Sequence, residues 1–92
     1  MVTTRFALGQ TVATPGALRA LEALGLPTLV LLARHATGDW GDLGAADKQM
    51  NDEAVRTGED RVLSAYTVGE RRFYVITEHD RSVTTLLLCS EY

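Results

Sequence analysis

The chain has 92 residues, of which 46% are apolar and 23% are charged, and its formal net charge is −3. A chain of this length has room for one hydrophobic core, so we expect residues 1–92 to form a single domain. The acidic balance argues against a nucleic-acid partner, because phosphate binding depends on clustered Lys and Arg side chains.

The cysteine content and the short apolar segments predict the compartment. The single cysteine, Cys89, excludes an internal disulfide and favours a reducing environment. The first residues lack the basic segment and apolar run of a signal peptide, and the longest apolar stretch, residues 29–33, falls far short of the roughly 20 residues that cross a bilayer. We therefore expect a cytoplasmic protein without a membrane partner.

The first half of the chain is expected to be mainly helical. Residues 6–12 form a short apolar run that predicts an edge strand or an ordered arm. Thr14 and Pro15 are typical of a helix start, and Gly25 is typical of a helix end. A second helix is expected over residues 27–38, and its short link to the first predicts a helical hairpin or a sharp corner.

A third, amphipathic helix is expected over residues 44–56. Its charged side chains recur on one side at helical spacing. The side chains expected to face inward are the apolar ones of this segment, which are Leu43, Ala46, Met50 and Ala54.

The last third of the chain changes to the alternating pattern of β-strands. Strands are expected over residues 61–68, 71–77 and 82–88, with short connections at residues 69–70 and 78–81. Short connections between successive strands predict an antiparallel meander. The expected fold class is therefore α+β, with two or three N-terminal helices packed on one face of a C-terminal three-stranded antiparallel meander.

The expected register separates two sheet faces of different chemistry. The better match for the helices is the more apolar face, with Leu63, Ala65, Tyr74, Ile76, Val83, Thr85 and Leu87. The other face mixes hydroxyl, aromatic and aliphatic groups, with Ser64, Tyr66, Phe73, Val75, Thr77, Ser82, Thr84 and Leu86. This second face is expected to be a part-covered surface, a pocket floor or a subunit contact.

A histidine beside a loop rich in Gly and Asp is the first candidate for chemistry. His35 lies at the expected end of the second helix, and Asp39, Trp40 and Asp42 follow it. This pattern fits a general base oriented by a carboxylate. A shared metal fits less well, because Gly38 ends the helix between His35 and Asp39. The alternative is structural, with His35 stabilising the helix end and Trp40 filling the seam between helix and sheet.

The loop before the last strand is the second candidate. Arg81 fits a clamp for a phosphate or a carboxylate, with hydroxyl groups from Ser82, Thr84 or Thr85. An ordinary charged hairpin loop or a protein contact is the alternative. The candidate catalytic residues are therefore His35, Arg81, Thr84 and Thr85.

Acidic side chains are concentrated in the middle of the chain. Residues 39–60 hold seven acids and two bases, a net charge of −5. This segment is either a solvated helix face with its flanking loops or an acidic surface presented to a basic partner. The candidate binding residues are Asp39, Trp40, Asp42, Asp52, Glu53, Glu78 and Arg81.

No cofactor or metal is expected from the motifs. The chain has neither a Gly-rich phosphate loop nor the Cys and His spacing of a zinc site. Cys89 has no histidine next to it, so we expect a small buried hydrophobic residue rather than a nucleophile.

Two stretches resemble those of a group of small proteins that bacterial plasmids and integrated mobile elements carry. They are residues 35–42, which read HxxGDWGD, and residues 76–88, which read ITExDRSVTTxLL. The similarity covers nearly the whole chain, although the group often has Pro where this chain has Cys89. The resemblance implies a bacterial, mobile-element setting and transfers no activity.

A looser similarity exists at the level of the fold. Helices followed by an antiparallel meander are the layout of the RelE and barnase-like ribonuclease toxins, whose sites combine His, Arg and hydroxyl residues. The analogy implies that His35 and Arg81, with Thr84 or Thr85, face an RNA phosphate in an open cleft. Such toxins are usually basic, whereas this chain is acidic.

The leading hypothesis is a non-catalytic accessory protein of a mobile element. It acts by binding a host or element-encoded protein, in an anti-defence or regulatory role. Homodimerisation is a further expectation, because three short helices cannot cover two semi-apolar sheet faces. The rival is a small ribonuclease or other phosphate-directed enzyme, and a metal-dependent enzyme ranks third.

Overall fold

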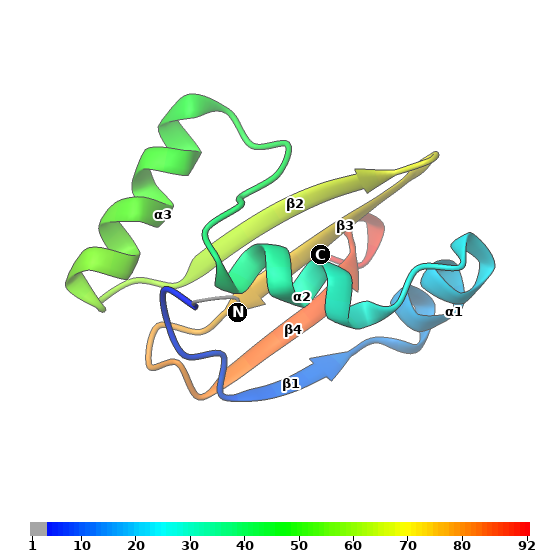
Figure 1. The fold of residues 1–92 in the computed structure, drawn as a ribbon, viewed down its shortest axis with the longest axis horizontal. Coiled ribbons are helices and arrows are strands. Elements are labelled where there is room, and N and C mark those ends of the chain that lie inside the picture. The colour runs from blue at the N-terminus through cyan, green and yellow to red at the C-terminus, as the bar shows by residue number, and fades with distance from the viewer. Residues whose placement is uncertain (1–3) are drawn as a thin grey trace.

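The structure is a computed structural model that describes residues 4–92. It consists of three α-helices, four strands and a final 3-10 turn (Figure 1). In chain order these are β1 (Gln10–Ala13), α1 (Pro15–Leu24), α2 (Thr28–Ala36), α3 (Ala45–Thr57), β2 (Val62–Val68), β3 (Arg71–Thr77), β4 (Val83–Leu88) and η1 (Cys89–Glu91).

The strands form one mixed sheet in the order β1-β4-β3-β2. The antiparallel β2-β3-β4 meander is as predicted, and the α+β fold class is confirmed. The N-terminal run supplies a fourth strand, shorter than the predicted segment, which pairs parallel to β4 with Gln10 opposite Val83. The two edge strands of the sheet are therefore β1 and β2.

Helices α1 and α2 form the predicted corner. The Thr14 hydroxyl accepts a hydrogen bond from the Ala17 amide at 3.1 Å, and Gly25 ends α1 in the left-handed conformation. In the described part of the chain no single helix is long and apolar enough to cross a membrane. Taken together, α1 and α2 have that length and composition, but their axes bend by 106° at the break between them.

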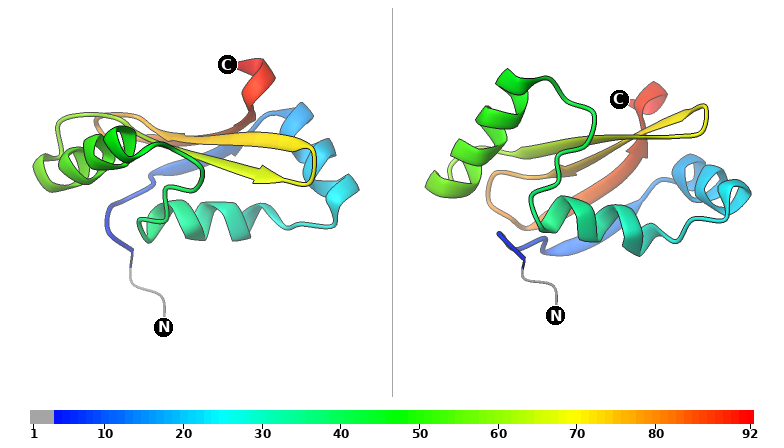
Figure 2. Two further views of the ribbon diagram at one scale, coloured as in Figure 1. Left: turned by 90° about the horizontal axis from the view of Figure 1, so that it is seen from above. Right: turned by 45° about the horizontal axis from the view of Figure 1, so that its top comes forward.

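The two sheet faces are used the opposite way round from the prediction. Helices α1 and α2 lie under one face, while η1 stands on the other (Figure 2). The helix-covered face is the one with mixed chemistry, and its Tyr66, Phe73, Val75 and Leu86 are fully buried against Leu21 and Leu31. The two aromatic rings supply the bulk that a helix contact requires, and the hydroxyls on this face are paired internally, as described below.

Helix α3 is also rotated relative to the prediction. It lies beside the β2 edge of the sheet (Figure 1), and its buried side chains are Asn51 and Ala54. Ala46 is exposed, and Met50 is 68% exposed instead of facing inward. The polar Asn51 takes the inward position because it hydrogen-bonds the backbone of the neighbouring strand.

A second, smaller core joins α3 to the sheet. Trp40 is buried together with Ala54 and Val62, and Phe6 packs against them. The Trp40 indole donates to the Asp52 carboxylate at 2.9 Å. Trp40 therefore fills the seam between helix and sheet, which agrees with the structural interpretation of this residue.

Candidate binding site

His35 lies at the centre of a buried chain of hydrogen bonds. Its side chain has no solvent exposure. The ring atom Nδ1 lies 2.6 Å from Ser64 Oγ, and Nε2 lies 2.9 Å from Thr77 Oγ1. Thr77 continues to Thr84 at 2.6 Å, and the Thr84 hydroxyl donates to the carbonyl of Leu8 at 2.7 Å. These groups satisfy one another and none of them faces an open cleft.

The carbonyl at the far end of this series of hydrogen bonds fixes the direction of each bond as far as Nε2 of His35. The Leu8 carbonyl can only accept, so Thr84 donates to it and therefore accepts from Thr77. Thr77 must then accept from Nε2–H of His35. Burial, followed by the charge of Arg81, lowers the pKa of His35 to about 3, so the ring is neutral at pH 7 and its Nδ1 accepts from the Ser64 hydroxyl.

Arg81 is committed to backbone carbonyls. Its Nη1 donates to Asp60 O at 2.7 Å and to the carbonyls of Glu78 and His79, and its Nη2 donates to Ala54 O at 2.9 Å. The guanidinium therefore holds the end of α3 against the loop between β3 and β4. The ribonuclease interpretation requires His35 and Arg81 to converge in an open cleft, and an enclosed His35 does not meet that requirement.

We expect R81A to lower the free energy of unfolding by about 1–3 kcal/mol, because these carbonyls lose a charged donor. Arg81 has a φ of +60°, a backbone conformation that disfavours side chains with a Cβ. R81G should therefore be about 1 kcal/mol more stable than R81A. Urea unfolding of the two variants and the parent measures both differences. An R81A variant as stable as the parent would show that the guanidinium is not a structural clamp.

The acidic residues before α3 also have structural partners. Asp39 pairs with Arg34 at 2.6 Å, and this hydrogen bond holds the pKa of the Asp39 carboxyl below its usual range. The Asp42 carboxylate accepts from the Thr67 amide at 2.7 Å, which likewise lowers its pKa. Among residues 4–92 no group of three metal-ligating side chains comes together. The loop residues thus fix the chain locally.

Groups from outside the sheet occupy the hydrogen-bonding positions along the outer edge of β2. The Asn51 side chain donates to Leu63 O at 2.6 Å and accepts from Leu63 N at 3.1 Å. Two residues further along the strand, the Ala65 amide donates to the carbonyl of Trp40, and the Ala65 carbonyl accepts from the amide of Asp42. The outer edge of β2 is therefore covered from Leu63 to Thr67, whose amide donates to Asp42.

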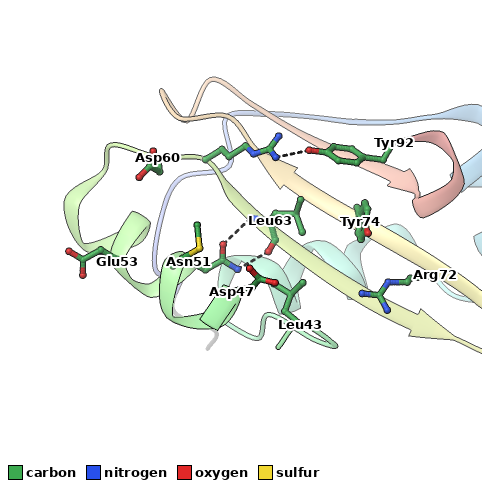
Figure 3. Close-up of a pocket in the computed structure, with 11 residues that line it drawn as sticks. Leu43, Asp47, Asn51, Glu53, Asp60, Leu63, Arg72, Tyr74 and Tyr92 are labelled. Carbon is green, nitrogen blue, oxygen red and sulfur yellow. Dashed lines mark hydrogen bonds between the residues drawn. The ribbon is translucent and has the colours of Figure 1, made fainter. Parts of the chain in front are cut away.

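A hollow of about 590 Å³ lies between α3 and the sheet face that α1 and α2 leave uncovered, which we call the helix-free face (Figure 3). We call this hollow the α3 hollow. Its floor and far wall carry Tyr74, Tyr92, Arg61 and Arg72, and the Arg61 guanidinium donates to the Tyr92 hydroxyl at 2.6 Å. The rings of Tyr74 and Tyr92 meet edge to face at 5.4 Å between centroids. The near wall is α3, with Asp47, Met50, Asn51 and Glu53.

Charges of both signs line the α3 hollow. The α3 side is acidic, with Asp47 and Glu53, whereas the strand side carries Arg61 and Arg72 together with Asp60. Met50 is 68% exposed and Tyr92 is 62% exposed, so large apolar groups remain open to solvent at its rim. Its lining contains no histidine, cysteine or serine. The arrangement can hold an apolar group between charges of both signs, and it lacks the usual nucleophiles.

The prediction of binding residues found one member of this site. Of the predicted set only Glu53 lines the α3 hollow, while Asp39, Trp40, Asp42, Asp52 and Arg81 hold the fold together. Glu78 is exposed on the loop between β3 and β4, and Thr85 is half-buried on the helix-free face. The other residues that line the hollow were not in the predicted set; they are Leu43, Asp47, Met50, Asn51, Asp60, Arg61, Leu63, Arg72, Tyr74 and Tyr92.

One signal in the sequence points to part of the missed site. Arg72 and Tyr74 are two apart on one strand, so they share a sheet face and bring a cation and an aromatic ring together there. Tyr92 lies beyond the last strand, and no spacing rule places it beside Tyr74. Comparison with protein-family models, with curated proteins and with solved structures finds no match to this chain.

Proposed function

We propose that this protein acts by binding another protein, encoded by the host or by a mobile element, through the α3 hollow. The proposal is carried by the lining of the hollow, which combines two tyrosines, two arginines and an exposed methionine. Tyr and Arg are the side chains most enriched among residues that dominate binding energy, and Met is enriched at interfaces as well. The rim of the α3 hollow is open, which suits a protruding segment of a partner protein better than an enclosed small molecule.

The charges around the hollow indicate the chemistry of that segment. An apolar or aromatic anchor would fill the space between Met50 and Tyr74. A basic side chain beside the anchor would meet Asp47, and an acidic one would meet Arg72 on the opposite wall. Glu53, on the same helix as Asp47, is already paired with Arg56. The plasmid and mobile-element setting implied by the sequence resemblance makes a host defence or regulatory protein the proposed partner.

The test uses a photo-crosslinking amino acid at position 50 in the protein expressed in a bacterial host that carries the element. A matched probe at Glu22 is the control, because Glu22 is exposed on α1, outside the lining of the hollow. We expect one discrete adduct from position 50 and none from position 22. Equal labelling from both positions, or none from either, contradicts the proposal.

The captured partner then allows a quantitative test. We expect Y92A and R72E each to weaken binding at least tenfold in calorimetry, a loss of about 1.4 kcal/mol or more. E22A should bind like the parent. Circular dichroism checks that the variants fold, since Tyr92 is largely exposed and Arg72 is exposed on β3. Unchanged affinity in both hollow variants would remove the α3 hollow from the interface.

A further inference from the structure

The two edge strands of the sheet differ in whether other groups cover their outer side. The β2 edge is covered by Asn51, Trp40 and Asp42, as described above. The β1 edge is the outermost strand on the other side, and no element lies beyond it in the described part of the chain (Figure 1). Its residues 10–12 are exposed. Open edges of this kind are templates for a further strand unless charge, proline or a covering segment blocks them.

The pairing of β1 with β4 determines which backbone N–H and C=O groups of β1 point away from the sheet. Gln10 N donates to Ser82 O at 3.0 Å, and Thr14 N donates to Leu86 O at 3.0 Å, so the even-numbered residues face β4. Because successive residues of a strand point their amide groups to opposite sides, Thr11 and Ala13 direct their N–H and C=O groups away from the sheet. Within residues 4–92 no hydrogen bond of the structure reaches these outward groups.

We propose that a second copy of this chain adds its own β1 to this edge, antiparallel, about a two-fold axis at Val12. In that register Thr11 faces Ala13 of the second copy and Ala13 faces its Thr11, so each pair exchanges two backbone hydrogen bonds. Val12 meets the second Val12 on the axis as a pair without backbone bonds, where side chains approach most closely. The edge thus complements itself, which an isologous dimer requires.

The surroundings of β1 favour a copy of the same chain. The strand Gln10–Ala13 carries no charge, so self-pairing places no like charges opposite each other. Gly9, with φ +65°, and Pro15 bound the open segment, which leaves little room for a shifted register. A strand pair this short buries too little surface for a stable dimer, and the remainder comes from apolar groups beside it.

These apolar groups line a groove along β1. A depression of about 250 Å³ is formed by β1 together with Leu18, Thr28, Leu32 and Leu86. Leu18 is 46% exposed, Val12 is 40% exposed, and Leu29, next to Thr28 on α2, is 71% exposed. The second copy would cover this groove with its own β1 and helical corner. The α3 hollow lies at the opposite edge of the sheet, so the inference does not depend on the proposed function.

Disulfide trapping tests the register. In a C89S background, V12C is expected to form a covalent dimer on mild oxidation, because paired residues without backbone bonds lie about 4.5 Å apart at Cα. Q10C, two residues away on the same face, would lie opposite Thr14 of the second copy and should stay monomeric. Equal trapping at both positions, or none at position 12, overturns the proposed pairing.

Light scattering of the full chain tests association itself. We expect twice the monomer mass at about 100 µM protein, a monomer for V12K, and an unchanged dimer for T67K, which places the same charge on the covered β2 edge. Val12 and Thr67 are both exposed, so neither lysine disturbs the fold. A parent chain that stays monomeric at this concentration overturns the inference, and so does a V12K variant that remains dimeric.

Discussion

Acidification from pH 7 to pH 5 should remove about 2 kcal/mol of folding free energy through His35 alone. The unfolded chain binds a proton at this residue near pH 6.5, whereas burial lowers the pKa of the folded-state imidazole to about 3. Below pH 6.5 the unfolded state therefore holds a proton that the folded state refuses, and stability falls as the pH falls. The contribution is complete above pH 6.5 and is lost progressively down to about pH 3.

The measurement is urea unfolding at half-unit steps from pH 7.5 to pH 4.5. We expect H35Q to flatten the fall in stability between pH 6.5 and pH 5, because glutamine offers a donor NH₂ group and an acceptor oxygen but does not titrate. H79Q is the matched control, since His79 is exposed on a loop. The carboxyl groups of Asp39, Asp42 and Asp80 have lowered pKa values, so their losses begin nearer pH 4 and are separable.

Nuclear magnetic resonance gives an independent check on the same residue. The direction of the hydrogen-bond chain requires the Nε2–H tautomer, which the two ring ¹⁵N shifts distinguish from the Nδ1–H form. An H35Q variant with the parent slope, or a ring that titrates above pH 6, would show that His35 does not carry the acid sensitivity.

G41A is expected to destabilise the protein by about 3–4 kcal/mol. Gly41 has a φ of +74°, and a Cβ there would lie 1.9 Å from the carbonyl oxygen of Ala65. That carbonyl accepts from the Asp42 amide, and the Ala65 amide donates to Trp40 O, so relief of the clash breaks the bridge that covers β2. Backbone strain adds about 1 kcal/mol to the two lost hydrogen bonds.

The G25A variant separates the cost of backbone strain at positive φ from the cost of a steric clash. Gly25 has nearly the same φ, +67°, but a Cβ added there would meet no atom of the described chain within 4 Å. We expect G25A to cost only about 1 kcal/mol, so the difference between the two alanine variants isolates the contact with Ala65. Urea midpoints at pH 7.5 provide the comparison. Equal losses in G41A and G25A would mean that the Gly41 segment moves aside freely.

The local elements were predictable because their signals are local. Thr14, Pro15 and Gly25 mark the ends of α1 through caps that involve neighbouring residues, and the change to alternation marks the meander. The parallel pairing of β1 with β4 could not be predicted from the sequence, because no short-range signal selects a strand so distant along the chain.

The assignment of the sheet faces failed mainly because the hydroxyl groups of the mixed face are paired inside the protein. In the sequence, Ser64, Thr77 and Thr84 resemble groups that need water, but His35 supplies a buried partner for two of them and Leu8 O for the third. A helix-end histidine and hydroxyls on separate strands can satisfy each other only in three dimensions. The same holds for Asn51, whose amide meets the Leu63 backbone.

The β1–β4 pairing also sets the order of events during synthesis. Residues 10–13 are made before residues 83–86, so β1 must wait for the strand with which it pairs in the described sheet. Until β4 is made, the sheet face that α1 and α2 cover is incomplete, and the apolar side chains of these helices, such as Leu21 and Leu31, stay exposed. The sheet should therefore be completed only after β4 has been made, in a late step that joins two segments far apart along the chain.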